Sequence, residues 1–330
     1  MAISLAEAKV GMSDKVDQMV IDTFQRSSLL LDRLTFDNSI SPGTGGSTLT
    51  YGYIQLLTPS TAAVRTINTE YTAGEAKRTE KTAKAIVMGG SFEIDRVIQN
   101  TSGAIDEMAF QMQQKIKATS NYFHNLVING TKAGSGAGYV VNTFDGLRKL
   151  LSGTSNELTS DTDISTSALM DSNAQEFIDE LDALVSAVDG GADMLMMNNK
   201  MLQRVRSCAR RAGYYERTKD DFGRTVETYC GVPLMDMGKY YDGENTVDTI
   251  STSANTSATG KSSIYAVSLG LDGFHGISPT GNKIISSYMP DMNAPGAVKK
   301  GEVELVAGVV LKNTLKAAVL KDIPIVAQST

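Results

Sequence analysis

The sequence has no excess of basic charge and few cysteines, and each absence excludes a class of protein. With 31 basic and 37 acidic residues, the formal net charge is −6. No overall positive field therefore favours tight binding of nucleic acid. Cys208 and Cys230 are the only cysteines. They are too few for a second metal-binding pair or a disulfide scaffold, and we expect two reduced thiols.

Long apolar runs are also missing. No stretch approaches the ~20 apolar residues that cross a membrane. The first residues, MAISLAEAKVGMSDK, lack the basic start and continuous apolar run of a signal peptide. These features predict a soluble protein that is made in the cytosol and has no membrane partner.

Residues that carry chemistry are scarce. His124 and His275 lie far apart in the sequence, and neither belongs to an HExxH motif. The stretch NTSATGKS (255–262) matches the phosphate-binding loop GxxxxGKS except at Asn255, but no strand precedes it and no helix follows, so we interpret it as a surface turn. GSGAG (134–138) is not a GxGxxG motif, and GxSxG does not occur. We expect no catalytic, cofactor-binding or metal-binding residue.

The first hundred residues predict an arm followed by a β-hairpin. Ser13 can cap an amphipathic helix, SSLLLDRLTF adds a second apolar patch, and SPGTGGST (41–48) is typical of a linker. From Thr48 to about Asn100 we find no good helix but four strand-like runs, TLTYGYIQLL, AAVRTI, AKAIVM and SFEIDRVI. The charged stretch 68–84 between them predicts a solvated hairpin tip or loop. An isolated hairpin is marginally stable, so we expect a neighbouring subunit to stabilise it.

Charged residues of this hairpin are candidates for a subunit interface. Two interpretations stay open, namely a solvated tip and a set of ion pairs that bridge subunits. The candidate residues are Glu70, Glu75, Lys77, Arg78, Glu80, Lys81 and Lys84.

The strongest helix prediction covers about 103–128. Ser102 is a plausible N-cap, Asp106 and Glu107 suit the positive end of the helix dipole, and Asn129-Gly130 is a natural stop. At 1.5 Å per residue this helix would be roughly 40 Å long. We therefore expect it to be the central long helix, or spine, of the fold. His124 on this helix is interpreted as a packed side chain. The predicted buried face consists of Ile105, Met108, Met112, Ile116, Phe123 and Val127.

A second region follows an expected exposed loop at 152–172. Ser172 and Gln175 form a possible capping box for a helix that ends at Asp189-Gly190-Gly191. Ala192 to Met197 predict a short buried strand, and Asn198 can cap the next helix. The apolar face of that helix is expected to hold Met201, Leu202, Val205, Cys208 and Ala209, with Arg204, Arg206, Arg210 and Arg211 mostly on its outer, solvated side.

The C-terminal third is mostly strand-like, so the fold class is α+β and not a regular βαβ alternation. The strand-like segments are RTVETYCGVPLMDMG, SSIYAVSLGL, NKIISSYM and EVELVAGVVLKNTLKAAVLKDI. His275 lies in LDGFHG, which we interpret as turn-like.

The order of these parts resembles the major capsid proteins of tailed bacteriophages, which share the Hong Kong 97-like fold. The resemblance covers nearly the whole chain. It is clearest in two segments, MLMMNNKMLQRVR and YCGVPLMDMG. In these, Asn198-Asn199 and Gly231-Val232-Pro233 occupy the positions of family motifs. It implies an N-terminal arm (1–47), an extended β-hairpin loop (48–100), a peripheral domain with the spine helix (101–171), a mainly axial domain (172–300) and C-terminal strands that return to the peripheral domain (301–330).

The resemblance also implies a function and partners. Copies of the chain would form hexamers and pentamers of an icosahedral virion shell around double-stranded DNA, without sequence-specific DNA binding. We expect a separate scaffold protein and a portal, a decoration protein as a further option, and assembly in the bacterial host cytoplasm. Some family members cross-link a loop lysine to a partner asparagine, for which Lys77, Lys81 or Lys84 would be available. The alternatives are an encapsulin-type compartment shell and a soluble enzyme of unknown type.

Overall fold

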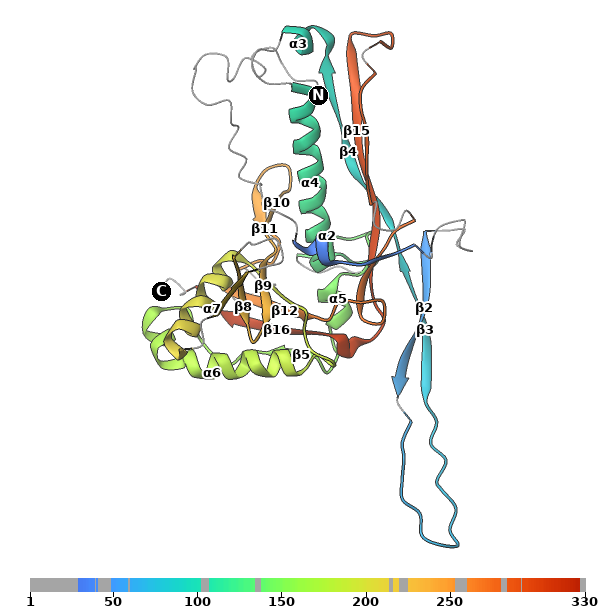
Figure 1. Ribbon diagram of the computed structural model, residues 1–330, viewed down its shortest axis with the longest axis vertical. Coiled ribbons are helices and arrows are strands. Elements are labelled where there is room, and N and C mark those ends of the chain that lie inside the picture. The colour runs from blue at the N-terminus through green and yellow to red at the C-terminus, as the bar shows by residue number, and fades with distance from the viewer. Residues whose placement is uncertain are drawn as a thin grey trace.

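A computed structural model describes residues 29–38, 40, 49–58, 60–101, 107–133, 138–213, 216–219, 225–252, 260–279, 284–291 and 293–326. The expected helix after Ser13, the linker at 41–48 and the Ser102 cap lie outside these residues. Figure 1 shows an elongated subunit in which a long helix and two long strands run side by side, a more compact sheet lies at one end of them, and a hairpin projects beyond the body.

The spine of the molecule is helix α4 (Glu107–Asn129) against strands β4 (Ile86–Asp95) and β15 (Val298–Leu311). The two strands pair antiparallel over ten positions, from Val298↔Asp95 to Ala307↔Ile86. Along most of β15 buried and less buried residues alternate, and Gly301 is the residue that leaves room for the Phe92 ring. The predicted helix is therefore confirmed over 107–128, and it ends at Asn129 as expected. Its described 23 residues span about 34 Å.

Three further strands complete this five-stranded sheet around β15. Strands β13 (Phe274–Ile277) and β14 (Ile285–Tyr288) pair antiparallel with different parts of β15, and the short β1 (Phe36–Asp37) pairs parallel with β13. Helix α2 (Leu29–Arg33) precedes β1, and helix α3 (Arg96–Thr101) follows β4 at the far tip. The expectation of no helix before Asn100 was thus wrong at Arg96–Thr101. The turn-like interpretation of His275 was also wrong, because four consecutive buried residues form β13.

A seven-stranded sheet forms the compact end of the subunit. Its order is β5-β16-β12-β6-β9-β8-β7, with β6 parallel to β9 and β16 parallel to β5. The strands are β5 (Glu157–Thr159), β6 (Met194–Met197), β7 (Glu216–Lys219), β8 (Thr225–Tyr229), β9 (Val232–Asp236), β12 (Lys261–Val267) and β16 (Ala317–Pro324). Strands β10 (Lys239–Tyr241) and β11 (Thr246–Asp248) form a separate hairpin.

The predicted strand before Asn198 is confirmed as β6, and both of its faces are buried. Met194 and Met196 belong to the core shared with α4 and helix α5 (Leu147–Leu151), whereas Leu195 and Met197 belong to the core under helices α6 (Ser167–Ser186) and α7 (Asn199–Ala212). A strand between two apolar layers needs no polar face, which explains the uninterrupted run MLMM. Asn198 caps α7 as expected, accepting the Met201 N–H at 2.7 Å.

The region 152–172 is not the expected exposed loop. It holds β5 and the first turn and a half of α6, and Asn156, Ser160 and Ile164 are buried. Helix α6 begins five residues before Ser172, because the Thr166 hydroxyl caps it by accepting the Leu169 N–H at 3.2 Å. Asn156 explains why a polar segment can be buried here, since its amide donates to Ala187 O at 3.0 Å and Ala317 O at 2.9 Å.

Sheet membership crosses the predicted domain limits after residues 100, 171 and 300. Strand β5 lies before residue 172 and β16 after residue 301, yet both belong to the seven-stranded sheet. Strand β4 lies within 48–100 but pairs with β15 of the spine. The predicted ranges therefore stay a prediction as domains, and we describe the molecule below by its sheets.

Candidate subunit-interface surfaces

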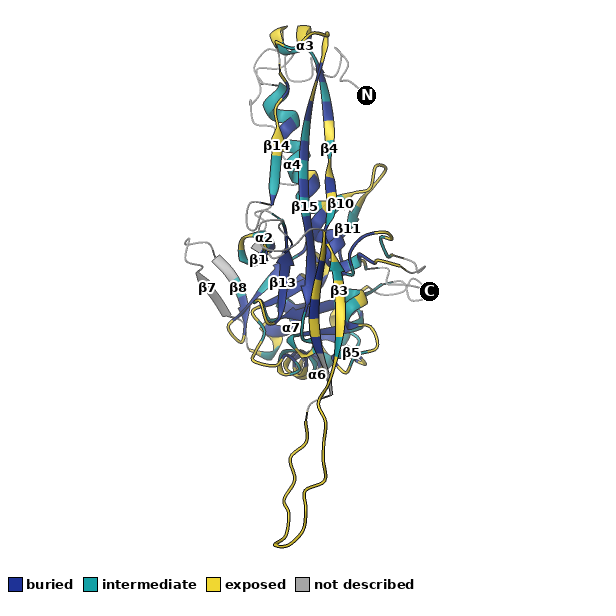
Figure 2. Ribbon diagram, turned by 90° about the vertical axis from the view of Figure 1, so that its right-hand side faces the viewer, coloured by how far each residue is buried: buried dark blue, intermediate teal, exposed yellow. Residues whose placement is uncertain are grey.

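The hairpin that projects from the body consists of β2 (Thr50–Thr58) and β3 (Lys77–Lys84). The two strands pair antiparallel from Thr50↔Lys84 to Thr58↔Lys77, with a bulge between Leu56 and Thr58. Most of β3 is exposed, and Figure 2 shows the exposed colour continuing from β3 through the loop beyond it. The prediction of a solvated hairpin tip or loop over 68–84 is confirmed for 68–76, but 77–84 form the strand β3. The strand-like run AAVRTI was wrong too, because 62–67 form no strand.

Large apolar side chains are exposed at the tip of this hairpin. Val64 is fully exposed, Ile67 is 90% exposed, and Tyr71 and Ile54 are about two-thirds exposed. Isolated apolar residues on a surface are ordinary, whereas several on one projecting element make that element a candidate contact site. This element buries little of its own apolar surface, so its stability depends on what covers it.

The tip nevertheless has an internal organisation. The Arg65 guanidinium lies over the Tyr71 ring at 5.3 Å and donates to Thr69 O at 3.2 Å. Thr69 also donates from its hydroxyl to Thr66 O at 2.8 Å, and Asn68 between them has a φ of 66°. A left-handed Asn at a tight turn is common. The tip is therefore a defined surface on which Val64 and Ile67 remain uncovered.

All seven predicted interface residues lie on this hairpin. Glu70 and Glu75 belong to the tip, and the other five, Lys77, Arg78, Glu80, Lys81 and Lys84, belong to β3. Every one of them is exposed. Within the described part of the chain, none of the seven side chains makes an ion pair or hydrogen bond with its own subunit. Their side chains are thus available to a neighbouring molecule, and their role at an interface stays a prediction.

The base of the hairpin is held by polar and aromatic contacts that the sequence did not single out. The Tyr51 hydroxyl donates to the Asp37 carboxylate at 3.1 Å, and the Tyr51 ring lies edge-on to His275 at 6.0 Å. The Lys312 ammonium lies over the Tyr51 ring at 5.5 Å. On the other strand, Lys132 Nζ donates to Thr82 O at 3.1 Å. A period-two pattern of tyrosines in TYGY could have indicated the buried face of β2.

Neither histidine has the surroundings of a catalytic group. His124 is buried on α4, and burial lowers its pKa to about 4. His275 is fully buried on β13, and its pKa is lowered first by burial and then by the positive charge of Lys312. The packed interpretation of His124 is confirmed. Cys208 is buried and Cys230 exposed, and they form no disulfide with each other, as expected.

The described ranges hold neither a metal-binding cluster nor a membrane-spanning helix. In them, no group of three or more His, Cys, Asp or Glu side chains is placed to hold a metal ion. No helix in the same ranges is both long and apolar enough to span a bilayer. Of the stretch 255–262, the structure describes the end, where Gly260 leads directly into strand β12 and not into a helix. A phosphate-binding loop needs a helix at this point.

The comparison with protein families decides the identity of this subunit. The sequence profile described as "SU10 major capsid protein" matches residues 33–232, which is more than half of the chain. The chain belongs to the SU10 major capsid protein family. It is a major capsid protein of the tailed-bacteriophage type and a component of the virion. The family is one of structural capsid proteins. No curated protein sequence matches the chain.

Solved structures agree with the fold of this capsid protein. The holo-SrpI encapsulin complex from Synechococcus elongatus matches with a TM-score of 0.63 at 14% identity, over 100% of this chain and 99% of that one. The capsid of Myoviridae phage XM1 matches with a TM-score of 0.59 at 13% identity, over 97% and 99%. Mycobacterium phage Adephagia matches with a TM-score of 0.57 at 10% identity, over 100% of both chains. The predicted Hong Kong 97-like α+β fold is confirmed.

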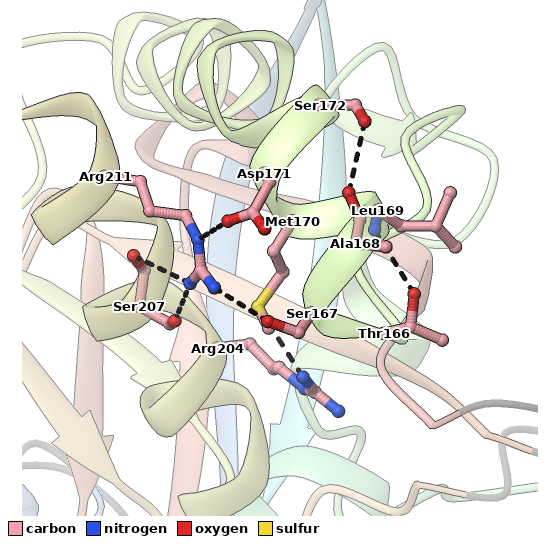
Figure 3. Close-up of polar contacts among 10 residues, drawn as sticks. All are labelled: Thr166, Ser167, Ala168, Leu169, Met170, Asp171, Ser172, Arg204, Ser207 and Arg211. Carbon is pink, nitrogen blue, oxygen red and sulfur yellow. Dashed lines mark hydrogen bonds and ion pairs between the residues drawn. The ribbon is translucent and has the colours of Figure 1, made fainter.

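Arginines of α7 hold the capsid protein's compact end together, so their expected position on a solvated face was only partly right. Arg204 donates to Ser165 O at 2.7 Å and to Ile325 O at 3.1 Å, and it also contacts the Met170 sulfur. Arg211 binds Asp171 and donates to the Ser167 hydroxyl at 3.0 Å (Figure 3). Arg210 is exposed as expected. These contacts tie α7 to the start of α6.

Proposed function

We propose that this capsid protein forms the hexamers and pentamers of an icosahedral shell, and that the β2–β3 hairpin is the element that engages a neighbouring copy. The observation that supports the proposal is the exposed tip, on which Val64 and Ile67 are almost wholly exposed and Tyr71 is about two-thirds exposed. Burying such side chains against another subunit is favourable at about 25 cal/mol per Å² of apolar surface.

The charged residues of the hairpin refine this proposal. Of the seven, Lys77, Arg78, Lys81 and Lys84 are basic, and Glu70, Glu75 and Glu80 are acidic. Both signs occur on one element, so a neighbour with the complementary pattern would fix the register of the contact as well as strengthen it. Exposed pairs are individually worth only ~0–1 kcal/mol. The apolar tip is therefore expected to supply the affinity and the charges to supply the specificity.

The partners of the shell are part of the same proposal. The chain assembles in the host cytoplasm with a separate scaffold protein and a portal, with or without a decoration protein, and encloses DNA without reading its sequence. The formal net charge of −6 supports enclosure without tight binding. The shell carries out no catalysis.

The deciding experiment is negative-stain electron microscopy of the purified chain, alone and with its candidate scaffold protein. Wild-type protein should give closed shells or capsomer rings. The triple variant Val64→Ser, Ile67→Ser, Tyr71→Ser should give folded subunits that do not assemble. The control is Val326→Ser, a partly exposed apolar residue that follows strand β16 and lies outside the hairpin. If the triple variant assembles as well as wild type, the hairpin does not engage a neighbouring copy as proposed. If wild-type protein stays unassembled both alone and with the scaffold protein, the proposal of a shell is contradicted.

A compartment shell is the second candidate function, and the match to the Synechococcus elongatus encapsulin favours it. The two functions differ in what the shell contains. Shells isolated from the natural source should hold double-stranded DNA if the chain acts in a virion. A co-purified cargo enzyme in place of DNA would support the compartment.

A further inference from the structure

The hairpin is joined to the body through one small apolar socket. Tyr51 and Tyr53 of β2 are its aromatic members, their ring centroids 6.2 Å apart. The socket is separate from the two large cores, and apart from the two tyrosines it contains Ile40, Ala85, Ile277 and Val310. Beyond Gln55 and Ala83 the described side chains of the hairpin are mainly exposed. The direction of the whole hairpin is therefore determined at this socket.

The segment before the hairpin runs from the large core to this socket. Leu30, Leu34 and Phe36 are buried in the core that contains α4. The next residue, Asp37, completes β1, where Ser278 N donates to Asp37 O at 3.0 Å. The Phe36 ring packs on Gly276, where an added Cβ would lie 2.4 Å from the ring. Residues 29–37 thus form a strap that is fixed at both ends.

The strap and the hairpin meet at one side-chain hydrogen bond. The Tyr51 hydroxyl donates to the Asp37 carboxylate at 3.1 Å. Two further groups, His275 and Lys312, contact the same tyrosine through its ring. Of the three, only Asp37 comes from the strap. Among the described side chains, this hydroxyl and carboxylate link the strap to β2.

The length of the hairpin makes its base sensitive to small changes. From Tyr51 to Ile67 the extended chain covers about 50 Å at ~3.3 Å per residue. With a lever of that length, a rotation of about 10° at the socket moves the tip by about 9 Å, which is about the separation of two packed sheets. A contact that limits this rotation decides whether the tip meets its binding position.

We propose that Asp37 and Tyr51 are positioning residues that set the direction of the hairpin, so that the strap at 29–37 and the hairpin move as one unit. The proposal rests on the proposed function, in which the hairpin engages a neighbouring copy. It assigns a role to a hydrogen bond at the base of the hairpin, away from the exposed tip. The strap thereby acts at the exposed tip although it lies at the opposite end of the lever.

The test measures the hairpin direction within one unassembled full-length subunit. Spin labels are placed at Val64→Cys in the tip and Gln175→Cys on α6, in a Cys230→Ser background that leaves only the buried Cys208. The distance distribution between the labels is recorded by pulsed electron paramagnetic resonance. Tyr51→Phe removes the hydroxyl and keeps the ring, and Asp37→Ala removes the acceptor. Both should broaden the distribution or shift it by several ångströms.

Three control variants separate positioning from general stability. Tyr53→Phe makes the same change two residues along β2, and should leave the distribution unchanged. Asp37→Asn keeps an oxygen acceptor and should retain most of the wild-type distribution. Lys132→Met removes the contact with Thr82 on β3, and should have a smaller effect than Tyr51→Phe. Thermal unfolding of each variant shows that the body remains folded.

Each outcome decides the proposal. A narrow, unshifted distribution for Tyr51→Phe would overturn it, and so would an equal broadening by Tyr53→Phe, since socket packing would then be the cause. If Asp37→Ala does not fold, Tyr51→Phe, which loses one oxygen atom, decides alone. The proposed function fails separately, through assembly of the Val64, Ile67, Tyr71 triple variant. Hairpin positioning is read in the subunit before assembly, so the two failures are distinguishable.

Discussion

The seven-stranded sheet and the β2–β3 hairpin are built on opposite principles. Strand β6 is buried on both faces between two apolar layers, whereas β3 is exposed along most of its length. The first region completes its hydrophobic core within one chain, and the second cannot do so. One subunit therefore contains a part that is stabilised by its own core and a part that is mostly exposed and that, under the proposed function, is stabilised by a neighbouring copy. Substitutions in the two parts should accordingly affect different measurements.

The largest expected effect is in the sheet region. Phe177 on α6 is fully buried in the core beneath α6 and α7. Phe177→Ala should lower the free energy of unfolding by about 3–5 kcal/mol, because it leaves a cavity as well as losing apolar contacts. Denaturant unfolding of the unassembled subunit measures this loss. A loss below about 1 kcal/mol would show that the core closes around the missing ring, contrary to a tightly packed layer.

A pH-dependent loss of similar size is expected from His124. Burial lowers its pKa to about 4 in the folded state, against 6.5 in the unfolded state. The unfolded chain therefore binds the proton first as the pH falls. The stability contributed by neutral His124 is complete above pH 6.5 and is lost on acidification towards pH 4, in total about 3 kcal/mol.

The matched variant for this prediction is His124→Gln, which does not titrate. Its unfolding free energy, followed over the same pH range, should fall less steeply than that of wild type. The difference between the two curves isolates the histidine from the carboxylates that titrate nearby in pH. Parallel curves would contradict the depressed pKa.

An intermediate effect is expected where β6 turns into α7. Asn198 caps α7, and its amide also donates to Ile250 O at 2.8 Å and Ser262 Oγ at 2.9 Å. Asn198→Ala should destabilise the subunit by about 2 kcal/mol, since the cap is lost and buried acceptors are left unpaired. Asn198→Ser keeps a cap oxygen and should lose less. Equal losses for the two variants would assign the whole effect to the buried amide.

The smallest effect on the subunit is expected at the hairpin tip. Ile67→Ser should change the free energy of unfolding by less than about 0.5 kcal/mol, since the side chain is 90% exposed. The same change should reduce the yield of assembled particles in a sedimentation assay. A large destabilisation of the isolated subunit would remove the contrast between the two regions.

The sequence predicted structure best where the signals for a helix or strand lie within the segment itself. Helices α4 and α7 and strand β6 follow from apolar periodicity and from the Asn198 cap, which are local signals. The exposed hairpin gave weaker signals, and β3 was mistaken for loop because an exposed, charged strand has no apolar alternation. The run AAVRTI was mistaken for a strand for the opposite reason. Its apolar residues belong to the exposed tip and not to a core.

Contacts between distant segments could not be predicted. The Asp37–Tyr51 bond joins two strands of different sheets, and no spacing in the sequence marks it. Arg204 was expected in solvent because its position on the helix is outward, but the chain returns at Ser165 and Ile325 to supply carbonyl acceptors. The seven charged residues of the hairpin were located correctly on its exposed surface. A single subunit does not show what they contact in another molecule, so their interface role stays a prediction.

The position of β16 within the seven-stranded sheet has a consequence for timing. Strand β16 lies between β5 and β12, so the sheet cannot close until residues 317–324 have been synthesised. At ~5–20 residues per second, the ribosome needs roughly 10 to 50 s to pass from Lys84 to Pro324. During that interval residues 50–84 of the hairpin have been synthesised, whereas the last strand of the seven-stranded sheet has not. A nascent subunit thus exposes the apolar tip of the hairpin well before its body can fold. Chaperones would have to protect the chain from aggregation during this interval.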